Sequence, residues 1–126
     1  MEVKTDTKEK FHVITVEIPH LTAIMTAELN QRLLPLLQTN IRNVVLNAKP
    51  IQIIDEEAAE GLVRMQQNFY EQNASFVICE LLPEVENFLD SIELLEVMNV
   101  TPTESEAADI VQMEEIEREL LDEEDI

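Results

Sequence analysis

The sequence predicts a single α/β domain built around a mostly parallel sheet, and three observations support this prediction. Short apolar segments alternate along the chain with longer segments in which apolar residues recur every three or four positions. The first two extended segments lie close enough to form a hairpin, and 126 residues suffice for one hydrophobic core. Because alternating strands and helices form right-handed crossovers, we expect parallel strands, an antiparallel edge at the N-terminus and about four helices.

The first segments predict a hairpin followed by a helix. Glu2–Thr7 alternates weakly and indicates an edge strand, whereas Phe11–Ile18 alternates clearly and ends before Pro19. Within Thr26–Gln38 the leucines recur at helical spacing, and the first threonine is a suitable N-cap. Pro35 lies inside this pattern and should kink the helix or mark its effective start, because proline lacks an N–H group.

The middle of the chain predicts two buried strands separated by a helix. Asn43–Asn47 is typical of a central strand covered on both faces, with Ile51–Ile54 as its extension. Apolar residues at helical spacing predict a helix over Glu56–Asn73. Ser75–Leu81 predicts the next buried strand, and Pro83 then suits the first turn of another helix.

The last part of the chain predicts a short strand at Val97–Val100 and a final helix. Thr103 and Glu106 have the spacing of a capping box at the start of this helix. Its apolar stripe consists of Ile110, Met113, Ile116 and Leu120. We expect the domain to span residues 1–121 and an acidic tail to occupy residues 122–126.

The formal net charge of -19 limits the classes of partner. Residues 65–126 hold 18 acidic side chains against one basic side chain, Arg118. Nucleic acids and anionic membranes are therefore excluded as partners, because both are bound mainly through Lys and Arg. The chain has no apolar run of about 18 residues and no apolar start, so we expect a cytoplasmic protein whose partners are proteins or cations.

The sequence offers no motif for catalysis or for metal binding. Cys79 lies in an apolar run and is predicted to be a small core residue, and neither His12 nor His20 has a carboxylate at metal-ligand spacing. The acidic C-terminal segment lacks the glycine turn of a calcium loop, and the chain has no tryptophan for a sugar-binding platform. We therefore expect no enzyme, no metal and no cofactor.

One cluster of carboxylates outside the C-terminal segment needs an explanation. Asp55, Glu56, Glu57 and Glu60 lie where a predicted strand becomes a helix. A purely structural role is adequate, because the positive end of a helix dipole stabilises negative groups by roughly 0.3–1 kcal/mol each. A role in binding is the alternative.

This junction resembles the STAS domain of bacterial anti-sigma factor antagonists, a SpoIIAA-like fold. The resemblance rests on Asn-Val-Val-Leu-Asn and Ile-Ile-Asp within Asn43–Asp55, followed at once by a helix. In that family the strand ends in Asp-Ser-Ser-Gly, with a phosphorylatable serine at the helix start, and a later strand of the Leu-Val-Leu-Cys type precedes another helix. Phe76–Leu82 and Glu84–Leu94 match the later pair, and the similarity spans about Lys10–Leu120.

The chain departs from the family at the modification site. Asp55 is retained, but Glu56 and Glu57 replace both serines and Ala58 replaces the glycine. Two adjacent carboxylates carry about the charge of one phosphoserine, which is roughly -1.5 to -2. The resemblance therefore implies a non-catalytic regulatory module that binds a protein, such as an anti-sigma factor or a kinase-like ATPase, through Asp55–Ala58 and Glu60, with fixed charge in place of the switch.

Two other functions stay open at this point. The same fold also serves as a soluble subunit of transport systems and as a module that holds a small ligand, so the fold alone does not decide the function. The third reading is a self-associating scaffold in which the acidic helix over Thr103–Leu121 pairs with a basic partner.

Overall fold

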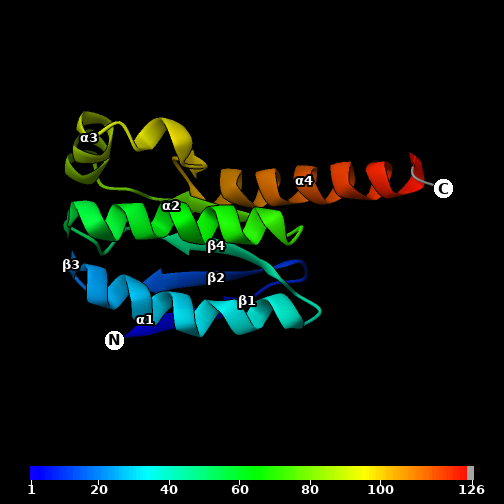
Figure 1. Cartoon of the computed structure of the whole chain (residues 1–126), viewed down its shortest axis with the longest axis horizontal. Helices are drawn as coiled ribbons and strands as arrows, with labels where there is room; N and C mark the ends of the chain where they lie inside the picture. Colours follow the sequence, from blue (N-terminus) through cyan, green and yellow to red (C-terminus); the bar gives the residue numbers. More distant parts are fainter. Residues whose placement is uncertain (125–126) are drawn as a thin grey trace.

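The computed structural model describes residues 1–124 and contains a five-stranded sheet with helices on both faces (Figure 1). The strand order is β1–β2–β4–β6–β7, in which β1 is antiparallel to β2 and the other neighbours are parallel. The strands are β1 (Val3–Thr7), β2 (Phe11–Val16), β4 (Asn43–Asn47), β6 (Phe76–Cys79) and β7 (Val100–Thr101). The predicted α/β class, with its antiparallel N-terminal edge, is confirmed.

A separate two-stranded parallel sheet pairs β3 (His20–Leu21) with β5 (Ile53–Ile54). The prediction that Ile51–Ile54 extends the central strand is therefore wrong. After β4 the chain turns, with the N–H of Ile51 donating to the carbonyl of Ala48 at 3.0 Å, and it then runs alongside the segment after β2. The N–H of Gln52 donates to the carbonyl of Pro19 at 2.7 Å, so the small sheet begins where β2 has ended.

The first helix begins earlier than its leucine spacing predicts. α1 (Ala23–Leu33) is capped by Thr22, whose hydroxyl accepts the N–H of Met25 at 3.3 Å. Thr26, the predicted N-cap, lies inside the helix, where its hydroxyl donates to the carbonyl of Thr22 at 3.0 Å. Pro35 neither kinks α1 nor marks its start, although its place in the leucine pattern predicts one or the other, because α1 ends at Leu33 and the proline lies in the first turn of the 3-10 helix η1 (Leu34–Gln38).

The remaining helices cover the two faces of the sheet unequally. They are α2 (Glu56–Glu71), α3 (Pro83–Ser91), the 3-10 helix η2 (Leu95–Val97) and α4 (Glu104–Glu124). The larger core lies between one face of the sheet and α1, α2 and α3. The smaller core joins Val13, Val45, Val77 and Cys79 of the opposite face to Ala107 and Val111 of α4. Successive residues of β2, β4 and β6 thus point alternately into the two cores, as expected because side chains alternate between the faces of a strand.

Close approach of α1 and α2 depends on the single glycine of the chain. A Cβ atom at Gly61 would meet Thr26 Cγ2 at 2.8 Å, which is too short for carbon atoms. A glycine inside a helix costs roughly 0.5–1 kcal/mol relative to alanine. Helix packing therefore explains the glycine at position 61, because only a residue without a side chain lets α1 and α2 approach this closely over the larger core.

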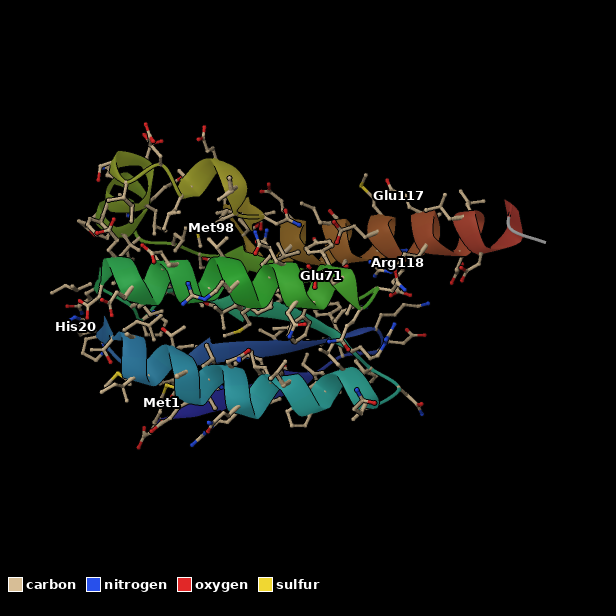
Figure 2. The ribbon with its side chains drawn as sticks, in the orientation of Figure 1. Met1, His20, Glu71, Met98, Glu117 and Arg118 are labelled. Atoms are coloured by element: carbon tan, nitrogen blue, oxygen red, sulfur yellow. The ribbon has the colours of Figure 1, made fainter. Side chains whose placement is uncertain are left out.

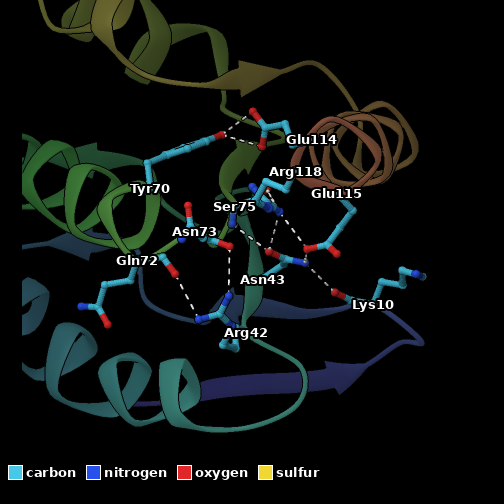
Figure 3. Close-up of polar contacts among 10 residues, drawn as sticks. All are labelled: Lys10, Arg42, Asn43, Tyr70, Gln72, Asn73, Ser75, Glu114, Glu115 and Arg118. Carbon is cyan, nitrogen blue, oxygen red and sulfur yellow. Dashed lines mark hydrogen bonds and ion pairs between the residues drawn. The ribbon is translucent and has the colours of Figure 1, made fainter. Parts of the chain in front are cut away.

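A cluster of polar side chains anchors α4 to the beginnings of β4 and β6 (Figure 3). The Arg118 guanidinium donates to Glu115 at 2.8 Å, to Ser75 Oγ at 3.0 Å and to Asn43 Oδ1 at 3.3 Å. Asn43 Nδ2 donates to Glu115 at 3.0 Å and to the carbonyl of Lys10 at 2.9 Å. Asn43 and Ser75 are buried, so these bonds satisfy polar groups that would otherwise lack hydrogen-bond partners in the interior.

The outer half of α4 differs from the amphipathic helix that its sequence indicates. Val111 is buried, but Met113, Ile116 and Leu120 of the predicted apolar stripe are 60%, 50% and 55% exposed. The inward positions are polar instead, because α4 runs toward the strand beginnings, where Asn43 needs partners. α4 continues through Glu124, so it includes the first part of the predicted tail at residues 122–126. Residues 125 and 126 lie outside the described part, and the domain boundary at residue 121 stays a prediction.

The Glu115 carboxylate gives a test of this anchor. Burial raises its pKa, but hydrogen bonds from Asn43 and Arg118 outweigh burial and hold the pKa below the ordinary value of 4.5. A carboxylate with a lowered pKa contributes stability above its unfolded-state pKa and loses it as the pH falls through the folded-state pKa. Glu115→Gln should therefore lower the free energy of unfolding at pH 7 by about 1 kcal/mol, with the difference disappearing in acid.

Urea denaturation of wild type and variant at pH 7 and pH 3 measures this difference. The matched control is Glu119→Gln, which removes the same charge from an exposed position of α4 and should leave the stability at pH 7 nearly unchanged. A Glu115→Gln deficit of equal size at both pH values would contradict the role assigned to the carboxylate.

Candidate functional site

The candidate site lies at the carboxyl ends of the parallel strands. In Figure 1 this is the left-hand end of the molecule, where β3, the start of α1, the start of α2 and α3 come together. Asp55 is the N-cap residue of α2, with extended backbone angles, and its carbonyl accepts the N–H of Ala59 at 2.9 Å. The helix begins at this place because β5 ends one residue before Asp55 and pairing with β3 fixes its direction.

His20 is the partner of Asp55, and sequence reasoning did not connect the two residues. His20 Nε2 lies 2.7 Å from Asp55 Oδ1, and because an ionised carboxylate only accepts, the imidazole donates. Both side chains are about half exposed, at 49% and 46%. The Asp55 side chain makes no capping bond to α2, so it ties the small sheet to the helix start instead.

The three glutamates predicted to bind a partner all point into solvent. Glu56, Glu57 and Glu60 are exposed, and the first two lie in the first turn of α2. Ala58 is fully buried among the residues of the larger core. Of the predicted site residues, Asp55 and the three glutamates therefore form the accessible surface, while Ala58 packs the start of α2 against the larger core.

Apolar side chains at the same end of the molecule are also exposed. Ile24 in the first turn of α1 is 77% exposed, and Ile53 on β5 is 58% exposed. Phe88 on α3 is 36% exposed. Exposed apolar groups beside charged groups are typical of protein-binding surfaces. The sequence pattern did not reveal Ile53, because its exposure depends on the pairing of β3 with β5.

A groove of about 580 Å³ runs between α1 and α2 and reaches the glutamates. Asn30 and Arg64 line it together with Glu57 and Glu60. The Oδ1 atom of Asn30 is buried and has no hydrogen-bond partner in the described part of the chain. The site therefore combines an acidic helix start, two exposed isoleucines and a shallow polar groove.

Cys79 and His12 are each held in a structural setting. Burial, and secondarily the nearby Glu104 and Glu80, raises the pKa of the Cys79 thiol to about 12, so the reactive thiolate does not form at neutral pH. His12 is held between the Thr7 hydroxyl and the carbonyl of Ile41, at 2.9 Å from each. Residues 1–124 contain no group of three His, Cys, Asp or Glu side chains placed to hold a metal ion, and no helix in this range is long and apolar enough to cross a membrane.

Comparison with models of protein families shows which family the chain belongs to. A model of the STAS domain matches residues 2–107. The chain belongs to the STAS domain family. The match covers the sheet, the candidate site and only the first residues of α4, so this STAS domain carries most of its last helix beyond the matched region. None of the curated protein sequences matches the chain significantly.

Solved structures agree with this assignment of the fold. An anti-sigma factor antagonist (STAS) domain protein from Planctomyces limnophilus is 19% identical, with a TM-score of 0.73 over 87% of this chain and 97% of that chain. A Moorella thermoacetica RsbS with glutamate in place of a serine is 15% identical, with a TM-score of 0.71 over 89% and 96%. The murine anion transporter Slc26a9 is 13% identical, with a TM-score of 0.65 over 82% of this chain but only 18% of that chain.

The exposed His20–Asp55 pair should contribute little to the stability of this STAS domain. An exposed hydrogen-bonded pair, charged or neutral, is worth at most about 1 kcal/mol, because both groups are well solvated when apart. His20→Ala should therefore lower the free energy of unfolding by less than about 1 kcal/mol, measured by urea denaturation at pH 7. Asp55→Ala, alone and combined with His20→Ala, completes a double-mutant cycle. A coupling above about 2 kcal/mol would show that the pair supports the fold rather than a surface.

Proposed function

We propose that this STAS domain is a non-catalytic module of the bacterial cytoplasm that regulates transcription by binding an anti-sigma factor or a related kinase-like ATPase. Binding takes place at the carboxyl end of the sheet, through Asp55, Glu56, Glu57 and Glu60, with Ala58 supporting the helix beneath them. The observation that carries this proposal is the exposure of Glu56 and Glu57 at the first turn of α2.

Charge and geometry at this turn support a fixed substitute for phosphoserine. Glu56 and Glu57 together carry about the same charge as one phosphoserine, although the carboxylate oxygens are distributed over two side chains. The positive end of α2 stabilises negative groups of either kind. The chain has no Ser, Thr or Tyr between residues 50 and 60, so the hydroxyl that a kinase would modify is missing from this junction. A solved structure of the similar RsbS also carries a glutamate in place of a serine, which supports the proposal that a STAS domain folds with such an exchange.

The exposed isoleucines supply apolar contact area, which the carboxylates do not provide. Ile24 and Ile53 provide apolar area that water would leave on binding, at roughly 25 cal/mol for each Å² buried. The carboxylates would then orient the partner and exclude partners of the wrong charge. A protein surface with a small apolar patch and basic neighbours fits this end of the domain.

Restoring the family serines tests the proposal. We expect Glu56→Ser/Glu57→Ser to bind the anti-sigma kinase encoded in the same genome at least about tenfold more weakly than wild type, measured by titration calorimetry. The reason is that the double variant removes two of the carboxylates that orient the partner on this surface. With ATP, mass spectrometry should find phosphate on the variant and none on residues 55–60 of wild type.

The matched control is Glu9→Ser/Glu71→Ser, which removes two exposed glutamates far from Glu56, one in the turn between β1 and β2 and one at the last residue of α2. This control should bind as wild type does, so a general effect of net charge is separated from an effect of position. Phosphate on residues 55–60 of wild type, or absence of binding by both wild type and the serine variant, would overturn the proposal.

A ligand-binding or transport-associated role is the second candidate, because the groove between α1 and α2 can hold a small polar molecule and the fold also forms part of an anion transporter. Thermal unfolding with nucleotides and lipids separates the two functions, since a ligand of the folded state raises the melting temperature. Under our proposal the midpoint stays unchanged. A concentration-dependent rise that Arg64→Ala abolishes would favour the ligand-binding function instead.

A further inference from the structure

The outer face of α4 presents an apolar stripe that the fold leaves uncovered. Met113, Ile116 and Leu120 follow one another at spacings of three and four, which places them on one side of the helix. All three are at least half exposed. By contrast, Leu62, Met65 and Phe69 of α2 are buried, as expected of an amphipathic helix on a sheet.

The opposite face of α4 explains why the stripe stays outside. Glu114, Glu115 and Arg118 face the molecule, where the Tyr70 hydroxyl donates to Glu114 at 2.7 Å and Arg118 reaches Ser75 and Asn43. These polar bonds fix the rotation of the helix. Figure 2 shows Arg118 on the side of α4 toward α2 and Glu117 on the side away from it. The apolar side chains are therefore held outward by the same contacts that anchor the helix.

Negative charge borders the stripe. Among the exposed carboxylates in the described part of α4, helical spacing places Glu106, Asp109, Glu117 and Glu119 beside it, whereas Asp122 lines a groove on the inner side with Glu115 and Arg118. Arg118 is the only basic residue of the helix, and it is engaged by Glu115 at 2.8 Å on the inner side. A partner of this face must cover apolar area while placing positive charges at its borders. A second copy of the chain would bring like charges together, and an anionic membrane would be repelled in the same way.

We propose that the outer face of α4 binds an amphipathic helix of another protein, one whose apolar side packs on Met113, Ile116 and Leu120 and whose Lys and Arg side chains pair with the flanking carboxylates. Helix pairs of this kind use apolar residues every three or four positions as anchors and bordering charges for specificity. The surface is separate from the site at Glu56, and it lies beyond residue 107, where the match to the family model ends. Binding here is therefore independent of the function proposed above.

A synthetic helical peptide tests this inference with the full chain. The probe places leucines at positions i, i+3, i+4 and i+7 and lysines elsewhere, and its comparison peptides are a scrambled sequence of the same composition and a version with glutamate for lysine. Fluorescence anisotropy should show tight binding of the patterned lysine peptide alone, weakened by added salt. Ile116→Ser/Leu120→Ser should weaken this binding about tenfold or more, because two apolar anchors are lost.

The matched control is Ile24→Ser/Ile53→Ser, which removes two exposed isoleucines at the other end of the molecule and should change peptide affinity less than about twofold. Glu117→Lys is a second variant that leaves the stripe intact, and it should weaken the lysine peptide and strengthen the glutamate peptide. Equal binding of patterned and scrambled peptides, or unchanged affinity in Ile116→Ser/Leu120→Ser, would overturn the proposal. Sedimentation showing dimers that this variant dissociates would overturn it too, because a second copy would then cover the face.

Discussion

The rest of the structure depends on β4, which is hydrogen-bonded on both edges and covered on both faces. β2 and β6 pair with it in parallel register, and Val44, Val45 and Leu46 are completely buried. Because the backbone groups of a buried strand have no access to water, they must be satisfied within the sheet. The chain comes out of the interior only at the carboxyl end of β4. From there it passes through the short strand β5 and enters α2 at the surface. The exposed position of Glu56 and Glu57 follows from this path.

Much of the fold could be predicted from the sequence because local patterns and tertiary structure agree. Alternation in β2, the apolar run of β4 and β6, the proline at the start of α3 and the capping box at Thr103 each indicate the element that forms. The N–H of Glu106 donates to Thr103 Oγ1 at 3.1 Å, as the capping box requires. The pairing of β3 with β5 was missed because each has only two residues, too few for a period to show. Without that pairing, His20 could not be placed beside Asp55.

The candidate site was predictable in its charges but not in its apolar part. The acidic run at residues 55–57 is visible in the sequence. The exposure of Ile53 could not be predicted, because the segment Ile-Gln-Ile-Ile is too short to show which isoleucine faces the core. The orientation of α4 was hidden for a related reason. Helical spacing shows that Met113 and Ile116 share a face, but only the polar groups at the beginnings of β4 and β6 decide which face turns inward.

The two acidic surfaces are attached to opposite ends of the same central strand. Asn43, the first residue of β4, holds α4 through Glu115 and Arg118, and the segment after Asn47 leads to the start of α2. Five residues of a strand span about 16 Å, which exceeds the screening length of about 8 Å at physiological salt. Charges at one end therefore have little direct effect on a partner at the other. Although the chain is strongly negative as a whole, the two proposed surfaces would select partners separately, each by the arrangement of apolar side chains among its carboxylates.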